Sequence, residues 1–407
     1  MNRMSRRGIL AASAAGGAFV STIAMAQNQP PEPMREGKGA TDPGPRNIAA
    51  ERDNPDLFAP PLTDAGDIPN LKWPFDLSHN RLQPGGWARQ TTTRELPVSK
   101  DIAGVDMRLE PGAIRELHWH KEDEWSLMLD GNARVTCIDE NGRNFIADVR
   151  KGDLWYFPSG LPHSIQALDQ GCEFLLVFDD GAFSEDNTFL LSQWTAHLPR
   201  SVLAKNFGVQ EGAFANIPEH QLYIFKAPVP PPLASDMVQD PRGPVPNPFT
   251  FKMMDMEPVR CSGGTVRIVD SSVFKASANI AAAFVEINPG GIRELHWHPL
   301  ADEWQYYISG RARMTVFGSG DNSRTFDFQA GDVGYVPRPM GHYIENIGDE
   351  PVLFLEMFKS PRYSDVSLQQ WLALIPPELV QAHLHLPDQM IAQLQKEKPL
   401  VVASQPG

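Results

Sequence analysis

The chain has 407 residues, of which 42% are hydrophobic and 21% are charged, and its formal net charge is −14. This length exceeds one typical domain, and the composition is that of a globular protein. The acidic balance argues against nucleic acids and anionic membrane surfaces as partners, but a locally placed arginine can still bind a small anionic substrate because distant surface charges are screened.

The first 26 residues have the pattern of an export signal. A basic start containing Arg6 and Arg7 leads into a run rich in Ala and Gly, and the segment Ala24–Ala26 offers a cleavage site before Gln27. Paired arginines directly before the apolar run resemble a twin-arginine signal, which exports folded proteins. We expect an exported protein, periplasmic or secreted. An ordinary secretory signal or a membrane anchor is the alternative.

Two proline-rich stretches divide the rest of the chain. Residues 27–70 are too polar and proline-rich for a core and predict an extended arm. Residues 226–249 predict a linker between two domains, at 71–225 and 250–400.

The two domains are repeats of one another. The segment "EPGAIRELHWHKEDEW" of the first half matches "NPGGIRELHWHPLADEW" of the second, and "KGDLWYFPSGLPHSI" matches "AGDVGYVPRPMGHYI". Within each half, short runs rich in Val, Ile, Phe and Tyr alternate with Gly, Pro, Asp and Asn clusters, which predicts an all-β jelly-roll barrel. Helical spacing in residues 188–215 and 365–395 predicts short helices outside each barrel.

Three cysteines, Cys137, Cys172 and Cys261, do not make a disulfide framework. The interpretation we favour is buried free thiols on strands, although Cys137 and Cys172 would be permitted to pair in an exported protein.

The RELHWH repeat carries a candidate metal site in each half. Residues two apart on a strand face the same side, so His118 and His120 converge, while Glu124 follows across a turn and His163 arrives on a later strand. Three imidazoles and one carboxylate suit a first-row divalent metal. A single His-x-His pair is more often a buried structural feature, but this set recurs in order in the second half. The second set consists of His296, His298, Glu303 and His342.

The duplicated motif, together with "FPSGLPHS", resembles the bicupin oxalate decarboxylase family over about residues 80–400. The resemblance implies two tandem cupin (jelly-roll) β-barrels with short flanking helices. It also implies one manganese ion per barrel, dioxygen as co-catalyst, and oxalate as the substrate that is converted into formate and carbon dioxide. A homohexamer is typical of bacterial members of that family.

Arg115 and Arg293 precede the first histidine of each set by three residues. Strand alternation alone does not bring them beside the ligands, although a turn or bulge would. A guanidinium group offers a planar fork to a carboxylate, so these arginines are candidate substrate-binding residues. Alternatively, Arg115 pairs with Glu116 or Glu124 and only orders the site.

The repeats differ after "LVF", where the first half carries about three extra residues within Ser184–Thr188. Such a small polar loop can open and close over a site, and desolvation of a glutamate on it favours the protonated acid. The resemblance implies that Glu185 protonates the fragment left after carbon dioxide departs, once metal and oxygen have oxidised the substrate by one electron. We therefore expect catalysis mainly in the first barrel.

Several further residues are candidates with packing as an equal alternative. Thr188 is a candidate hydrogen-bond partner for the closed loop, Glu356 for facing the second metal site, and Tyr223 for approaching the first. Trp119 and Trp297 face away from the ligands, which predicts packing in the core or at an interface.

The loop leaves alternative functions open. Some members of the family carry Ser-Glu-Asn-Ser-Thr here, whereas this chain has Asp186 and Asn187 at the third and fourth positions. Because loop composition in the family is linked to the balance of decarboxylation and oxidation, oxalate oxidase is the closest alternative. A non-enzymatic bicupin that binds a metal or a small acid is a third.

Overall fold

The computed structural model describes residues 34–35, 38–39, 45, 47–57 and 60–404. The chain divides into two compact units, Met1–Leu62 and Thr63–Gly407. The described part of the first unit holds the short strands β1 (Met34–Arg35) and β2 (Lys38–Gly39), the helix α1 (Ile48–Asp53) and the 3-10 turn η2 (Pro55–Leu57). The expected export signal lies outside the described residues.

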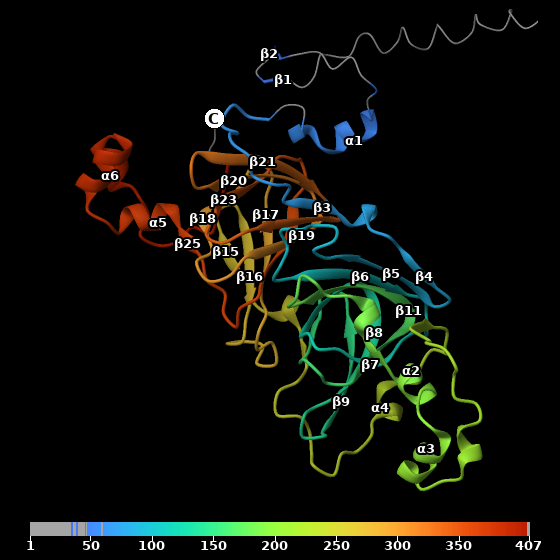
Figure 1. Cartoon of the computed structure of the whole chain (residues 1–407). Helices are drawn as coiled ribbons and strands as arrows, with labels where there is room; N and C mark the ends of the chain where they lie inside the picture. Colours follow the sequence, from blue (N-terminus) through green and yellow to red (C-terminus); the bar gives the residue numbers. More distant parts are fainter. Residues whose placement is uncertain (1–33, 36–37, 40–44, 46, 58–59, 405–407) are drawn as a thin grey trace, which may run out of the picture. The chain divides into compact units, whose positions relative to one another are not determined.

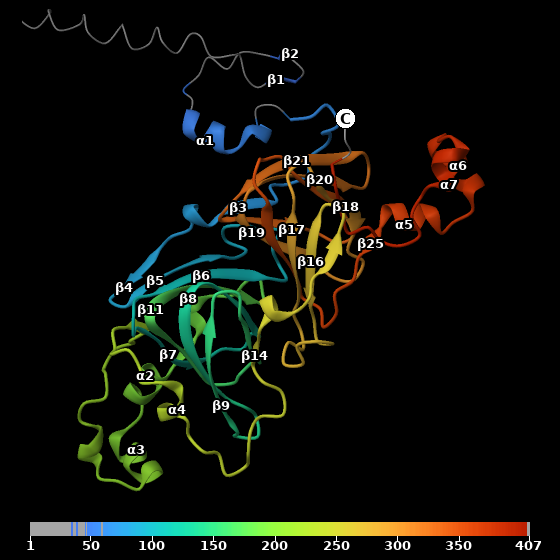
Figure 2. The ribbon, with the colours of Figure 1, turned by 180° about the vertical axis from the view of Figure 1, so that it is seen from behind.

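The unit Thr63–Gly407 contains two β-barrels, which Figures 1 and 2 show from opposite sides. The first barrel is built from consecutive strands that begin with the hairpin β4–β5 and end after the helical excursion. These strands are β4 (Arg81–Gln83), β5 (Gly86–Thr91), β6 (Ala103–Leu109), β7 (Ile114–Trp119), β8 (Glu124–Ile138), β9 (Asn144–Arg150), β10 (Leu154–Phe157), β11 (His163–Phe178), β12 (Phe189–Leu190) and β13 (Ile224–Phe225).

The second barrel repeats this arrangement after the linker. Its strands are β15 (Val259–Cys261), β16 (Gly264–Val269), β17 (Ala281–Ile287), β18 (Ile292–Trp297), β19 (Glu303–Ser309), β20 (Arg311–Gly318), β21 (Asn322–Gln329), β22 (Asp332–Val336), β23 (Gly341–Asn346), β24 (Val352–Phe358), β25 (Val366–Ser367) and β26 (Val401–Val402).

The strand order is the same in both barrels. The first runs β10-β8-β11-β6-β5-β4 and the second runs β22-β19-β24-β17-β16-β15. The long strands β8 and β11 pair with each other along both their halves, with a register shift between Ala167 and Cys172. In the second barrel β8 corresponds to the two strands β19 and β20, and β11 corresponds to β23 and β24. The predicted pair of jelly-roll barrels is confirmed.

The barrels exchange one edge strand each. Strand β3 (Lys72–Pro74) pairs with β22 of the second barrel, and β14 (Thr250–Phe251) pairs with β10 of the first. The sequence-based boundaries at 71 and 250 therefore assign each of these strands to the barrel that follows it in the chain, whereas its ladder hydrogen bonds go to the other one. A buried ion pair of 2.9 Å between Lys72 and Asp332 accompanies the exchange.

A hydrophobic core extends from the first barrel into the second. Phe75 packs edge-on against Tyr306 at 5.7 Å between ring centroids, and Trp304 is fully buried beside Gly104. A Cβ atom at Gly104 would lie 2.5 Å from the Trp304 ring, so only glycine permits this close approach.

Among the described residues the three cysteines are free, and Cys137 and Cys172 are buried. Burial raises the pKa of each of these two thiols to about 12, which makes them unreactive core residues.

Short helices follow each barrel, as the apolar spacing predicted, and lie outside the strands (Figures 1 and 2). They are α2 (Leu191–Ala196), α3 (Arg200–Phe207) and the 3-10 turn η5 (Glu211–Phe214) in the first half, α4 (Leu233–Asp236) in the linker, and α5 (Leu368–Ala373), α6 (Pro377–Leu384) and α7 (Asp388–Ala392) in the second half. None of the helices in the described part of the chain is long and apolar enough to cross a membrane.

Candidate metal centres and the adjoining acid loop

The first predicted ligand set comes together inside the first barrel. His118 on β7 lies opposite His163 at the start of β11, His120 follows directly after β7, and Glu124 opens β8 beside the far end of β11. All four side chains are buried, and one ligand atom from each lies within 4.8 Å of the others.

The second set is its equivalent inside the second barrel. His296 on β18 lies opposite His342 on β23, and His298 and Glu303 flank the turn before β19. These four ligand atoms also lie within 4.8 Å of one another, and all four residues are buried.

The backbone fixes which nitrogen of each histidine faces the centre. Every Nδ1 in the two sets lies 2.5–3.1 Å from a backbone carbonyl oxygen, to which it donates, so the Nε2 atoms carry the lone pairs. Burial and the neighbouring arginine lower the pKa of His118 and of His296 well below the usual value, which keeps both rings neutral.

Lone pairs meet a carboxylate at the centre of each set. Glu303 Oε2 lies 3.2 Å from His298 Nε2 and 2.7 Å from His342 Nε2, and Glu124 Oε2 lies 3.2 Å from His120 Nε2. Without a proton or a cation between them these electron-rich atoms repel, and a divalent metal ion satisfies them all. The three-nitrogen, one-oxygen donor set therefore fits a first-row metal.

The carboxylate ligands are themselves oriented by hydrogen bonds. Glu124 Oε1 accepts from Trp155 Nε1 and from Ser126 Oγ, both at 3.2 Å, and Glu303 Oε1 accepts from Gln305 Nε2 at 2.9 Å. Such partners fix the direction in which the second oxygen points.

A β-bulge brings Arg115 to the ligand side of β7. On β11 His163 and Ile165 lie two positions apart, whereas their partners His118 and Arg115 on β7 lie three positions apart. The extra residue reverses the alternation, so Arg115 is buried on the same side as His118. The equivalent shift on β18 does the same for Arg293.

The two arginines have different surroundings. Arg293 Nε donates to Glu356 Oε1 at 3.0 Å, and its Nη2 donates to Asp365 Oδ2 and to the Tyr363 hydroxyl, each at 2.7 Å. Lys398 forms a further ion pair with Asp365. The second arginine is thus neutralised by two carboxylates within the chain.

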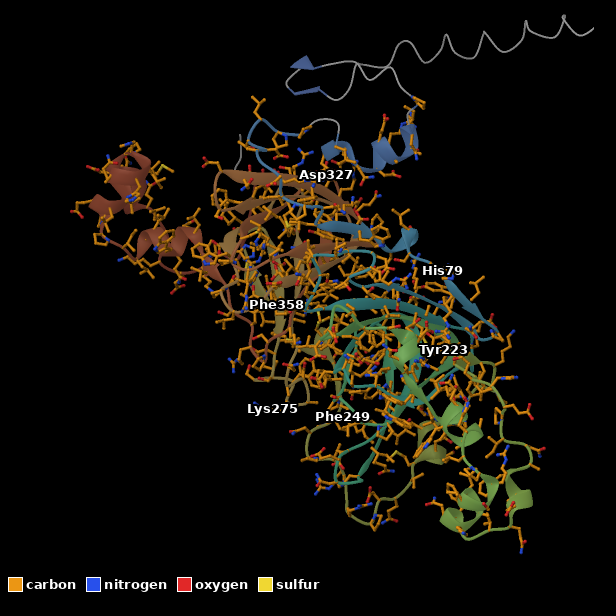
Figure 3. All side chains as sticks on the ribbon, viewed as in Figure 1. His79, Tyr223, Phe249, Lys275, Asp327 and Phe358 are labelled. Atoms are coloured by element: carbon orange, nitrogen blue, oxygen red, sulfur yellow. The ribbon has the colours of Figure 1, made fainter. Side chains whose placement is uncertain are left out.

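Arg115 lacks such partners. Its guanidinium stacks 4.2 Å from the centroid of the Tyr223 ring, which Figure 3 labels, and its buried Nη1 has no hydrogen-bond partner in the described part of the chain. Leu176 takes the place of Glu356 in the first barrel. Glu356 on β24 lies between Ala283 on β17 and Gln305 on β19. Leu176 on β11 lies between the matching residues, Val105 on β6 and Ser126 on β8. The first barrel therefore holds a buried arginine with a hydrogen-bond donor available for a ligand.

The alternative pairing of Arg115 with Glu116 or with Glu124 is not found among the described residues. The Glu116 carboxylate instead accepts from the backbone N–H groups of Ser192, Leu222 and Tyr223 at 2.7–3.0 Å. It thereby ties the helical excursion after the loop back to β7.

The loop Ser184–Thr188, hereafter the lid, contains the 3-10 turn η4 (Glu185–Asn187). The Ser184 hydroxyl caps the turn by accepting from the Asp186 N–H at 3.3 Å. Pairing of Phe189 with Trp119 and of Val366 with Trp297 aligns the halves and shows that the first half is longer between Phe178 and Phe189, the segment that contains the lid. In the described part of the second half no 3-10 turn lies between Phe358 and Val366.

Glu185 is buried in the lid, with 9% of its surface exposed. Burial raises the pKa of its carboxyl group, although the Tyr223 hydroxyl and the positive charges of Arg115 and Arg81 oppose this effect. A raised pKa keeps this carboxyl group protonated to a higher pH than a solvent-exposed glutamate. Thr188 is also buried, but its hydroxyl has no hydrogen-bond partner in the described residues.

Other expected residues have clear packing roles. Trp119 stacks on Phe189 at 5.6 Å and meets Trp194 edge-on, and Trp297 meets Trp371 edge-on. Both tryptophans point away from the ligand sets.

The sequence reasoning missed Tyr363, Asp365 and Leu176. A sequence signal for the difference at Leu176 was available in the repeats. The segment "LLVF" of the first half aligns with "LEMF" of the second, in which the glutamate supplies the negative charge that pairs with Arg293. The strand register confirms that Leu176 and Glu356 are equivalent.

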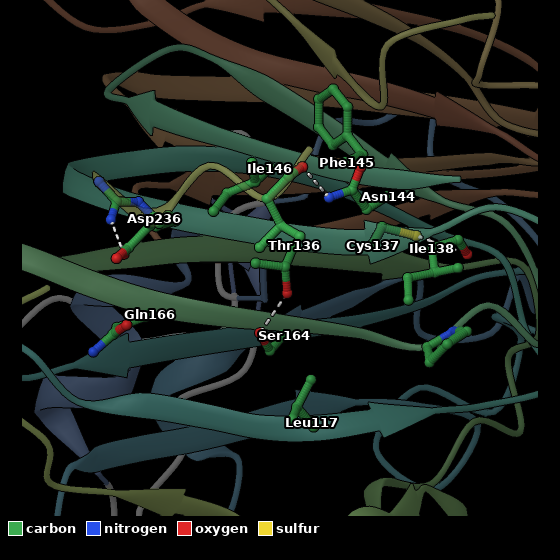
Figure 4. Close-up of a pocket in the computed structure, with 13 residues that line it drawn as sticks. Leu117, Thr136, Cys137, Ile138, Asn144, Phe145, Ile146, Ser164, Gln166 and Asp236 are labelled. Atoms are coloured by element: carbon green, nitrogen blue, oxygen red, sulfur yellow. Dashed lines mark hydrogen bonds and ion pairs between the residues drawn. The ribbon is translucent and has the colours of Figure 1, made fainter. Parts of the chain in front are cut away.

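Figure 4 shows a pocket of ≈ 380 Å³ on the outer face of the first barrel. Its lining includes Leu117, Thr136 and Ser164, and the two hydroxyls lie 2.7 Å apart. The lining contains none of the predicted metal ligands, so this pocket is separate from the metal centres.

Comparison with known proteins agrees with this geometry. Residues 76–213 and 255–392 each match the cupin family. The chain is 58% identical to oxalate decarboxylase OxdC of Bacillus subtilis (strain 168), over 92% of this chain and 98% of that protein. It belongs to the bicupin oxalate decarboxylase family.

A fungal relative and a solved structure extend this comparison. A probable oxalate decarboxylase of Arthroderma benhamiae is 41% identical over 92% of this chain and 94% of its own length. A structure of Bacillus subtilis oxalate decarboxylase, studied for its Mn(II) centres, superposes with a TM-score of 0.91 at 57% identity and covers 93% of this chain and all of that one. The family match extends over both barrels.

Proposed function

We propose that this bicupin converts oxalate into formate and carbon dioxide, and that the reaction takes place in the first barrel. The observation that carries the proposal is the contrast between the arginines: Arg115 is buried with an unpartnered nitrogen beside a buried acid, whereas Arg293 is already bound to two carboxylates. The 58% identity to an oxalate decarboxylase over nearly the whole chain supports the choice of substrate.

Arg115 would bind one carboxylate of oxalate. A guanidinium group makes two parallel hydrogen bonds to a carboxylate, and its strength as a binding group increases away from water. The Tyr223 ring holds the guanidinium plane in place without occupying its hydrogen-bond donors.

We assign manganese to both ligand sets, in keeping with the Mn(II) centres of the Bacillus subtilis enzyme. The histidines and glutamates of each set would hold it, and with dioxygen as co-catalyst it would supply the one-electron oxidation that weakens the carbon–carbon bond.

Glu185 would deliver the proton that completes formate. The carbon–carbon bond breaks, carbon dioxide leaves, and a carbon–hydrogen bond forms with a proton from the Glu185 carboxyl group, so one proton is consumed per turnover. A buried acid with a raised pKa suits this step, and the closed lid also excludes water.

Product analysis tests the proposal. Manganese-loaded protein given oxalate under air should release formate as the main product, and Glu185→Ala should abolish formate while both metal ions remain bound. Hydrogen peroxide as the main product would make the protein an oxalate oxidase. Oxalate binding without either product at acidic pH would favour a binding protein.

We further propose that the chain is exported by the twin-arginine route and assembles as a homohexamer. The Arg6-Arg7 start supports the first, and membership of the family supports the second. Cell fractionation of the chain with Arg6 and Arg7 both changed to Lys should leave it in the cytoplasm, and light scattering of the mature protein should give six times the chain mass. Unimpaired export, or a monomer mass, would contradict the respective proposal.

A further inference from the structure

Arg81 connects the lid to the barrel. Its Nη1 donates to Asp186 Oδ1 at 3.1 Å, and its guanidinium carbon lies 3.8 Å from the centroid of the Tyr223 ring. Arg81 stands on β4, far from the lid in sequence. One side chain therefore contacts both the lid residue next to Glu185 and the aromatic ring below it.

Tyr223 gives these contacts a rigid base. Its backbone has φ 53°, a left-handed conformation that is uncommon for a bulky residue, and the Glu116 carboxylate accepts from its N–H at 2.8 Å. Its carbonyl oxygen accepts from the Glu116 N–H at 2.9 Å. The ring that carries both Arg81 and Arg115 is thus fixed to β7, the strand that bears the first metal ligand.

The described part of the second barrel has neither an arginine equivalent to Arg81 nor a turn equivalent to the one that carries Asp186. In the hairpin β4–β5 Arg81 pairs with Ala88, and in the hairpin β15–β16 the equivalent pair is Val259 with Val266. The turn that carries Asp186 is also missing there, because the second half is shorter between its paired strands. The ion pair therefore accompanies the lid rather than the cupin fold in general.

We propose that Arg81 is a positioning residue that holds the lid closed over the first metal site, through Asp186 on the lid and Tyr223 on the barrel. This inference rests on the proposed function. A closed lid keeps Glu185 beside the reacting carbon and favours formate. With the lid open, the proton is not delivered, and oxalate is instead oxidised to two molecules of carbon dioxide while dioxygen and two protons form hydrogen peroxide.

The ion pair is exposed on one side, since Asp186 is 83% and Arg81 22% exposed, so salt should weaken it. Asp186→Asn removes the charge and keeps the shape. We expect this variant to raise the peroxide-to-formate ratio about 2- to 5-fold, the range that corresponds to an exposed ion pair. Added sodium chloride should raise the ratio of the unchanged protein towards that of the variant, and should leave the variant unchanged.

Two further variants separate the contacts. Arg81→Lys keeps the charge but loses the planar stacking on Tyr223, and Arg81→Val reproduces the residue of the second barrel and loses both contacts. The peroxide-to-formate ratio should rise more in Arg81→Val, which loses both contacts, than in Arg81→Lys or Asp186→Asn, each of which loses one. Asp130→Asn breaks a comparable exposed pair, with Lys151 at 3.5 Å, and should change nothing.

Hydrogen–deuterium exchange of the lid provides a readout independent of turnover. In the manganese-loaded protein, exchange at residues 184–188 should be faster in Asp186→Asn than in the unchanged chain or in Asp130→Asn. Equal exchange and an equal product ratio in Asp186→Asn and the unchanged protein would overturn the role of Arg81. Absence of formate from the unchanged protein would instead overturn the proposed function, while the exchange rates would still test the contact.

Discussion

Arg115 and Arg293 occupy the same position of the same six-residue motif, and both are buried beside three histidines. Their difference comes from residues elsewhere in the chain. Glu356 and Asp365 bind Arg293 within the protein, whereas Arg115 meets an aromatic face that leaves its hydrogen-bond donors available. The chemistry of a residue in this fold therefore depends on what the neighbouring strands bring to it.

Lysine substitutions at the two positions should have different effects. Arg115→Lys loses the planar fork, so we expect the KM for oxalate to rise at least about 10-fold, the loss of roughly one charge-assisted hydrogen bond. Arg293→Lys should leave KM within about 2-fold but should lower the thermal midpoint, since breaking a buried ion-pair network destabilises by about 3–5 kcal/mol. Steady-state kinetics and calorimetry on both variants measure this. Similar KM values for both would contradict the assignment.

The raised pKa of Glu185 also predicts a pH dependence of stability. The folded chain holds this proton more tightly than the unfolded chain, so its contribution to stability is present below the unfolded pKa and is lost as pH rises through the folded pKa. Glu185→Gln carries no titrating group. The thermal midpoint of the variant, relative to that of the unchanged protein, should therefore increase as pH rises above about 4.5. A difference that stays constant with pH would show that Glu185 titrates normally.

At the scale of the elements, strand register decides which residues meet the metal sites. The bulge on β7 turns Arg115 inward, and Leu176 on β11 occupies the position at which the second barrel has Glu356. Equivalent register in the second barrel brings in Glu356.

Changing Leu176 to Glu should give the first barrel what the second has, a buried arginine paired with a carboxylate on the neighbouring strand. The new carboxylate would bind Arg115 as Glu356 binds Arg293, and formate production should fall at least about 10-fold, as expected when a buried charge becomes paired within the protein. Leu176→Met is the matched control, because it keeps the volume and adds no charge. Product assays with metal analysis check this. Full activity in Leu176→Glu with both metals bound would show that the arginine is not the oxalate site.

The fold and the two ligand sets could be predicted from sequence because both depend on short-range patterns that the duplication repeats. His118 and His120 follow from strand alternation alone. The ion pairs of Arg293 could not be predicted, since they depend on the register of β24 and on a loop in which Tyr363 and Asp365 approach from a different segment. Equally, the contact between Arg81 and Asp186 joins residues 105 positions apart, which no local pattern reports.

At the scale of the whole molecule, both metal sites should contribute to stability. A ligand that binds only the folded chain stabilises it by about 2.7 kcal/mol when its concentration is 100 times its dissociation constant. Chelation should therefore lower the thermal midpoint, and manganese should restore it. His118→Ala and His296→Ala should each leave one ion per chain instead of two by elemental analysis. Two ions in either variant would show that the ion does not depend on that histidine.

The exchange of β3 and β14 has a further consequence for how such a chain can arise and be divided. Cutting the linker 226–249 would leave the first fragment carrying β3, which pairs with the second barrel, and missing β14, which pairs with the first. Each fragment would expose an unpaired sheet edge, a known site of aggregation. Co-expressed fragments would be expected to recombine through these strands. Because each barrel is completed by a strand from the other side of the linker, neither barrel is expected to fold as an independent module.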